Sequence, residues 1–160
     1  AQVASEGLAR WDDAKLDAQR ARIEAALIGE GALPSDAGAE AADVRATIAA
    51  VLRDPRGRWL FDATHEDARS EWALTGVDGG DTVHLVVDHT FVADGVRWIV
   101  DFKTGAHEGA DPGAFLDAEV ERYRGQLERY GRIVAALDPA HPVRLALYHP
   151  RVAGGWREIV

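Results

Sequence analysis

The sequence contains no cysteine and no methionine, and only two of its 18 basic residues are lysines, Lys15 and Lys103. Without cysteine, a disulfide scaffold, a zinc site with cysteine ligands and a cysteine-bound iron–sulfur cluster are all excluded. The sequence also has no run of about 18 apolar residues, so no transmembrane helix is expected. Because no signal peptide opens the chain, we predict a cytoplasmic location.

The absence of methionine extends to position 1, which indicates a processed chain or a fragment of a longer protein. A helical spacing of apolar residues is already present at Val3, Leu8 and Trp11, with no capping residue before it. We therefore favour a fragment. Its 160 residues correspond to about one domain, and we predict a single domain over residues 1–160 with a helical N-terminal part over 1–55.

The net charge of −9 argues against a nucleic-acid partner, because phosphate binding depends on cationic surfaces. The charge is unevenly distributed, however. Residues 1–121 carry a net charge of −13, whereas residues 122–160 carry +4. This asymmetry is compatible with a C-terminal end that faces a polyanion, and equally with arginines that solvate an ordinary fold.

The spacing of apolar residues predicts helices over residues 3–28, 36–53 and 112–137. Ser35 or Asp36 can cap the second helix, and Asp54-Pro55 ends it. Strands are predicted over 71–75, 83–92, 96–102 and 143–148, with a possible edge strand over 156–160, and turn chemistry occupies 77–81. The resulting fold class is α/β, a mixed sheet with flanking helices in which helices precede a three-strand meander, a further helix and a strand.

The strands over 83–92 and 96–102 form a predicted hairpin around Asp94-Gly95, a pair that favours a two-residue type I′ turn. With that turn, Ala93 pairs with Val96 and Asp88 lies directly opposite Asp101. Directly opposed residues share one face of a sheet, with Cβ atoms about 4.5–5.5 Å apart. Lys103, two residues beyond Asp101, points to the same face.

Two carboxylates at that separation repel each other unless a cation lies between them. Lys103 alone could supply the cation, as a structural ion pair. A hard divalent ion is the alternative, because Mg²⁺ binds through one or two carboxylates and keeps several waters. The spacing alone favours neither interpretation.

Three motifs in the sequence resemble those of a known family. Asp88, twelve intervening residues and then Asp101-x-Lys103 resemble the catalytic motif of the PD-(D/E)XK nuclease superfamily. Segment 99–105, IVDFKTG, and segment 123–130, YRGQLERY, are similar to the corresponding motifs of RecB-type nucleases, which lie at the C-terminus of helicase–nucleases of the exonuclease V β-subunit or AddA type. The resemblance covers about residues 40–149 and implies a restriction-endonuclease-like fold with a catalytic core over 70–149.

The resemblance also implies a site. Asp88, Asp101 and the backbone carbonyl of Phe102 would bind Mg²⁺ or Mn²⁺, and Lys103 would orient the attacking water or neutralise the phosphorane. Supporting or DNA-contacting roles would belong to Glu71, Gln126, Tyr130 and Arg122. Tyr123 and Tyr130 can equally be read as part of the apolar helix stripe.

Several histidines bear on the match. RecB-type nucleases carry a metal-binding histidine on an upstream helix, and none of the six histidines fits that position. A fragment cut after that helix would explain the difference. His89, beside Asp88, faces the opposite way and is interpreted as a surface residue. His141-Pro142 and His149-Pro150 lie at loop edges and are interpreted as turns.

The resemblance therefore implies a metal-dependent DNA nuclease domain, an exonuclease rather than an endonuclease, in a DNA-repair or recombination helicase–nuclease. Its expected partners are DNA, the helicase part of the parent chain and a second subunit, with no membrane. A non-catalytic nuclease-fold module that binds DNA or a partner subunit is the first alternative. An interaction domain in which Asp88, Asp101 and Lys103 form only a structural ion pair is the second.

Overall fold

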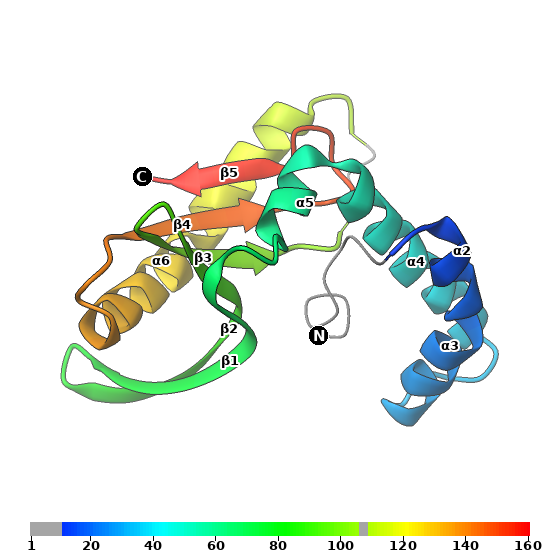
Figure 1. Cartoon of the computed structure of the whole chain (residues 1–160), viewed down its shortest axis with the longest axis horizontal. Coiled ribbons are helices and arrows are strands. Elements are labelled where there is room, and N and C mark those ends of the chain that lie inside the picture. The colour runs from blue at the N-terminus through cyan, green and yellow to red at the C-terminus, as the bar shows by residue number, and fades with distance from the viewer. Residues whose placement is uncertain (1–10, 106–108) are drawn as a thin grey trace. The chain divides into compact units, whose positions relative to one another are not determined.

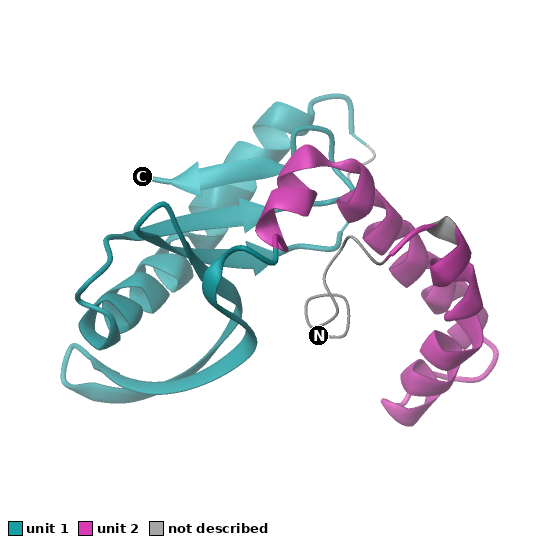
Figure 2. Cartoon of the chain, in the orientation of Figure 1, with its two compact units in different colours: residues 1, 63–160 teal, residues 2–62 magenta. Residues whose placement is uncertain are grey.

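A computed structural model describes residues 11–105 and 109–160 of the chain. Of these, residues 11–62 cluster in a helical unit, and residues 63–105 and 109–160 in a unit built on a sheet (Figure 2). The protein has mixed α/β architecture, as the hydrophobic periodicity predicts. In the described part of the chain, no helix has the length and apolar character needed to cross a membrane.

The helical unit contains α2 (Asp13–Ala18), α3 (Arg20–Gly29), α4 (Ala37–Arg53) and α5 (Pro55–Leu60). The sequence predicts one continuous helix over residues 3–28, of which residues 3–10 lie outside the described part of the chain. Within the described residues the prediction is wrong, because a turn at Gln19 separates α2 from α3. Asp12 caps α2 by accepting a hydrogen bond from the Lys15 amide at 2.7 Å. The ends of α4 agree with prediction to within one residue.

Residues 55–60 form a further helix that the spacing of apolar residues does not predict. Asp54 ends α4 and also caps α5, since its side chain accepts a hydrogen bond from the Arg56 amide at 2.9 Å. Pro55 occupies the first helical position, where its missing N–H has no cost. In the α2–α4 region Trp11, Leu16 and Ala49 form a small core, and complete burial of Leu16 contributes roughly 1.5–3 kcal/mol.

The sheet has five strands in the order β1–β2–β3–β4–β5 (Figure 1). They are β1 (Glu66–Asp78), β2 (Asp81–Ala93), β3 (Val96–Phe102), β4 (Val143–Tyr148) and β5 (Trp156–Ile159). Only β3 and β4 are parallel. Helix α6 (Pro112–Leu137) connects them, because parallel neighbours need a long crossover. The predicted bounds of α6 and β4 are confirmed.

The predicted hairpin between β2 and β3 is confirmed. Asp94 and Gly95 have φ angles of 51° and 74°, as a type I′ turn requires. The register runs from Ala93–Val96 to His89–Val100, as predicted. The β1–β2 hairpin is longer than the predicted strands, since β1 covers 66–78 and its turn consists of Gly79 and Gly80, both with positive φ.

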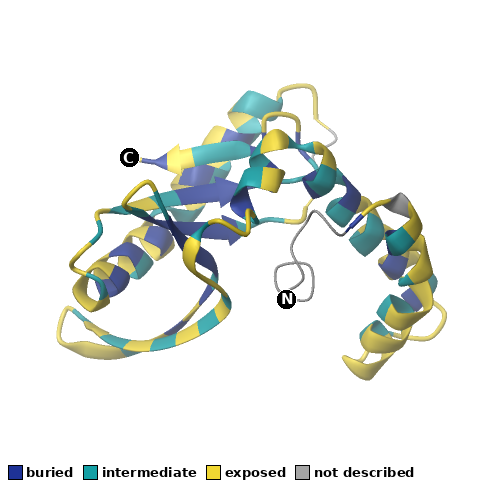
Figure 3. Cartoon of the chain, viewed as in Figure 1, coloured by how far each residue is buried: buried dark blue, intermediate teal, exposed yellow. Residues whose placement is uncertain are grey.

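Helix α6 lies across one face of the sheet (Figure 1). Its buried residues and those of the strands form the main apolar core, which Figure 3 shows as the dark blue positions of α6 and the central strands. The core consists of Leu85, Val87, Ile99, Val120, Leu127, Ile133, Val134, Leu147 and Ile159. This packing fixes α6 relative to the middle of β2 and the carboxyl end of β3, where the candidate site lies.

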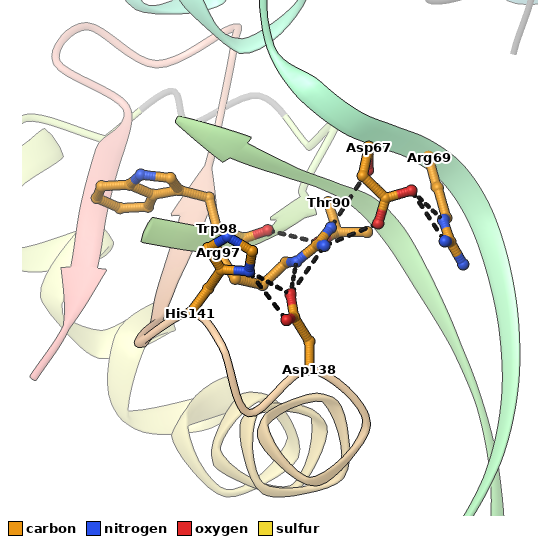
Figure 4. Close-up of polar contacts among 7 residues, drawn as sticks. All are labelled: Asp67, Arg69, Thr90, Arg97, Trp98, Asp138 and His141. Atoms are coloured by element: carbon orange, nitrogen blue, oxygen red, sulfur yellow. Dashed lines mark hydrogen bonds and ion pairs between the residues drawn. The ribbon is translucent and has the colours of Figure 1, made fainter. Parts of the chain in front are cut away.

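At the amino end of β3, the buried Arg97 side chain forms hydrogen bonds to two aspartates (Figure 4). The Arg97 side chain is 5% exposed and donates to Asp138 Oδ2 at 2.9 Å, to Asp67 Oδ2 at 2.7 Å and to the Asp67 carbonyl at 3.2 Å. Burial acts against ionisation of Asp67, but hydrogen bonds from Arg97 and Arg69 outweigh it and lower the pKa of this carboxyl. Contacts with His141 and Arg97 likewise lower the pKa of Asp138. The network connects β1, β3 and the end of α6.

Candidate active site

Asp101 and Lys103 lie together at the carboxyl end of β3. Asp101 is 4% exposed, and Lys103 Nζ lies 2.5 Å from its Oδ2. This distance is that of a short ion pair. Because Asp101 and Lys103 are two positions apart along the chain, their side chains lie on one face of the sheet, as predicted.

Asp88 reaches β3 through its side chain. The backbone ladder between β2 and β3 ends at His89–Val100, one pair before the predicted pairing of Asp88 with Asp101. Instead, Asp88 Oδ2 accepts a hydrogen bond from the Phe102 amide at 2.9 Å. The carboxylate thus replaces the main-chain acceptor that a continued ladder would supply, and it stays beside the end of β3.

Burial is the largest influence on Asp101, and it raises the pKa of this carboxyl. Lys103 counteracts the effect, while the neighbouring Asp88 carboxylate adds to it. One ammonium group therefore accompanies two carboxylates, one of them buried. A buried carboxylate next to a second carboxylate, with one ammonium group for the two, is a suitable environment for an additional cation.

The site offers fewer ligands than a preformed metal cage. Across the two described ranges, no three His, Asp or Glu side chains are grouped so that they could hold a metal ion. A pair of carboxylates nevertheless fits Mg²⁺ or Mn²⁺, because Mg²⁺ typically binds through one or two carboxylates and retains waters. The Phe102 carbonyl remains a predicted third ligand.

Glu71 lies on β1 at the level of Asp88. The pairs Ser70–His89 and Trp72–Val87 flank these two positions on β1 and β2. Glu71 is exposed, and its φ of 52° lies in the left-handed region that residues other than glycine seldom adopt. Such backbone strain is typical of functional sites, so the kink in β1 is consistent with the predicted supporting role.

The predicted residues of α6 fall into two groups. Tyr123 lies under Lys103, whose Nζ is 3.9 Å from the ring centroid. Gln126 and Tyr130 lie further along the helix and bond to each other, Nε2 donating to the hydroxyl at 3.0 Å. Together with β2 residues 83–85 they line a groove of about 360 Å³. Arg122 is exposed and pairs with Glu119 at 3.4 Å.

The arginines of the basic C-terminal segment are engaged with acidic side chains. Arg129 and Arg132 both pair with Asp78 at the end of β1, at 3.2 and 3.0 Å. Further ion pairs in this segment are Arg124–Glu121, Arg144–Glu158 and Arg157–Asp117. The local excess of positive charge is therefore largely compensated by neighbours within the fold.

Two histidines differ from expectation. His89 is not a surface residue: it is 3% exposed, and its Nδ1 lies 3.0 Å from Ser70 Oγ. His149 is not simply a turn residue either, since it is 1% exposed and no described residue hydrogen-bonds to either ring nitrogen. Its ring contacts Phe115 edge-on, with centroids 5.5 Å apart. Burial lowers the pKa of His149, Glu119 opposes this and Lys103 adds to it.

His149 is the residue near the site that motif reasoning missed. Residues 143–148 form an apolar run that continues directly into His149, and this continuity was the available signal. The β3–β4 register explains the location: Phe102 pairs with Tyr148, so the next positions are Lys103 and His149. The Lys103 amide also donates to the Tyr148 carbonyl at 3.0 Å.

Comparison with protein-family models and with curated proteins finds no match to this chain. The family interpretation consequently depends on the motifs in the sequence and on the local arrangement of Asp88, Asp101 and Lys103.

Proposed function

We propose that this chain is a metal-dependent DNA nuclease domain of the RecB type, with a restriction-endonuclease-like fold. The observation that carries the proposal is the convergence of Asp88, Asp101 and Lys103 at the end of β3. There the Asp88 carboxylate accepts the Phe102 amide and Lys103 pairs with buried Asp101. This is the residue set that the motif resemblance predicts.

The element order supports the same proposal. Helices precede β1, β2 and β3, and α6 and β4 follow, which is the order that the resemblance implies. In α/β sheets, ligands bind beyond the carboxyl ends of the parallel strands. Asp101 and Lys103 lie at that end of β3.

Asp88 and Asp101 would hold Mg²⁺ or Mn²⁺, which would lower the pKa of a bound water and offset charge on the phosphate. Lys103 would donate hydrogen bonds from its ammonium group to the attacking water or to a phosphate oxygen. Asp101 would orient Lys103 through their ion pair. Asp88 would fix the end of β3 through the Phe102 amide.

A cleavage assay tests the proposal. Labelled linear DNA is incubated with Mg²⁺ or Mn²⁺ and the wild type, Asp101→Asn or Lys103→Met, with Lys15→Met as the matched lysine control. We expect either site variant to lower the cleavage rate by about 10²–10³-fold, and the control to cleave like the wild type. Equal cleavage by all four proteins would contradict the proposal.

The ion-paired arginines favour a second candidate, a non-catalytic nuclease-fold module that binds a partner subunit or DNA. Such a module would bind DNA or a partner in a separate binding measurement, and it would not cleave DNA in the assay above. The attachment to a helicase and a second subunit is also part of the proposal, and it depends on the family resemblance alone.

A further inference from the structure

Lys103 is held from two sides. Its Nζ lies 2.5 Å from Asp101 Oδ2 and 3.9 Å from the centroid of the Tyr123 ring. The face of an aromatic ring carries partial negative charge and attracts ammonium groups within about 6 Å. The ring and the carboxylate therefore act on the same ammonium.

The Tyr123 ring is itself fixed by the core. Tyr123 lies between Val120 and Leu127 on the buried face of α6, and its side chain packs against the main core cluster. Residues three and four positions apart share one helix face, so anchoring of Val120 and Leu127 orients Tyr123. The Arg122 guanidinium is also near the ring, 5.2 Å from its centroid.

We infer that Tyr123 is a positioning residue, whose ring face holds the Lys103 ammonium where the reaction needs it. The inference rests on the proposed nuclease function. A lysine side chain is flexible, with four carbons between its ammonium and the backbone, and Asp101 supplies contact from one side only. Removing the ring takes away one of these two contacts and gives the ammonium more freedom to move.

Two substitutions separate the ring from its hydroxyl. Tyr123→Phe keeps the ring face, whereas Tyr123→Leu keeps apolar bulk without a ring. For Mn²⁺-dependent DNA cleavage, we expect Tyr123→Leu to lower kcat by about 10- to 100-fold, as small misplacements of reacting groups do, with KM for DNA unchanged. Tyr123→Phe should stay within about threefold of the wild type. A kcat for Tyr123→Leu equal to that of the wild type overturns the inference.

A second readout requires no catalysis. Because Lys15 and Lys103 are the only lysines, ¹³C-lysine labelling gives two sets of Hε signals, which Lys103→Met assigns. Lys15 Nζ lies 4.6 Å from the Trp11 ring centroid and provides an internal control. We expect the Lys103 Hε signal to be shifted upfield by the ring current in the wild type and Tyr123→Phe. The shift should disappear in Tyr123→Leu and persist in Tyr130→Leu, while the Lys15 signal stays constant.

The two readouts distinguish the inference from the function on which it rests. An unshifted Lys103 signal in a protein that cleaves DNA overturns the role of Tyr123 alone. A shifted signal in a protein that does not cleave DNA overturns both the role and the proposed function. A shifted signal together with the expected loss of kcat supports both.

Discussion

Asp101 shows how a single residue can favour function over stability. Its carboxyl group is buried next to another carboxylate, and its pKa is raised by that burial. A pKa above the ordinary value of 3.8 means that the contribution of this carboxyl group to stability is greatest at low pH. The contribution decreases as the pH rises through the folded-state pKa. At neutral pH the ionised side chain therefore destabilises the fold.

We accordingly predict that Asp101→Asn increases the free energy of unfolding at pH 7 by about 1 kcal/mol, although it removes a proposed metal ligand. Urea unfolding at pH 7 and pH 4 measures the effect, which should be smaller at the lower pH. A variant that is less stable than the wild type at pH 7 would show that the Lys103 ion pair contributes more than burial costs.

His149 is a second buried side chain whose ionisation affects stability. It is buried, its nitrogens have no hydrogen-bond partner among the described residues, and burial lowers its pKa below 6.5. Its neutral form belongs to the folded state, so stability is complete above about pH 6.5 and decreases as the pH falls. Leucine has a similar volume and no polar atom. His149→Leu should raise stability by about 1–2 kcal/mol at pH 7.

The same substitution should weaken the loss of stability between pH 7 and pH 5. Thermal unfolding across that range, with His84→Leu as an exposed-histidine control, measures both effects. A destabilised His149→Leu protein with an unchanged pH dependence would indicate that the ring has a partner, such as a bound water, that the leucine removes.

Among the elements of the sheet unit, β1, β3 and the end of α6 are all connected through the side chain of Arg97. Arg97→Met leaves Asp67 and Asp138 without their shared cation. Both carboxylates are partly exposed, so we expect the free energy of unfolding to fall by about 2–3 kcal/mol, less than for a fully buried pair. Urea unfolding at pH 7 measures it, and Arg144→Met, which breaks a surface pair with Glu158, is the control.

The pH dependence of that variant gives an independent check. Since the pKa values of Asp67 and Asp138 are lowered, their stabilising effect is present above about pH 3.8 and is lost as the pH falls below it. Arg97→Met should therefore lose less stability on acidification than the wild type. An equal acid sensitivity would show that other carboxylates dominate.

Elements with strong local signals could be predicted, and those without such signals could not. Helix α6 has a proline at its start and a regular apolar stripe, and the β2–β3 hairpin has Asp94-Gly95 between alternating strands. Strand β1 begins with exposed polar residues, so alternation alone misses its first part. The break at Gln19 and the helix after Pro55 depend on packing and capping that periodicity does not register.

For the molecule as a whole, the sequence predicts the composition of the candidate site better than its geometry. The hairpin register places Asp88, Asp101 and Lys103 close together, because antiparallel pairing is fixed by the turn. The hydrogen bond that the Asp88 side chain accepts from the Phe102 amide could not be predicted from the register, since this bond forms where the ladder ends. The contact of Tyr123 with Lys103 depends on the packing of α6 on the sheet, which is a tertiary feature.

If Asp88 and Asp101 form a metal site, calorimetric titration of Mn²⁺ into the whole chain should detect binding there. The wild type is compared with Asp88→Ala and Asp101→Ala, and with Asp94→Ala in the β2–β3 turn as an acidic control. We expect one binding event in the wild type and in the control, and the loss of this event in both site variants. Binding that persists in both site variants, or that is absent from all four proteins, would contradict it.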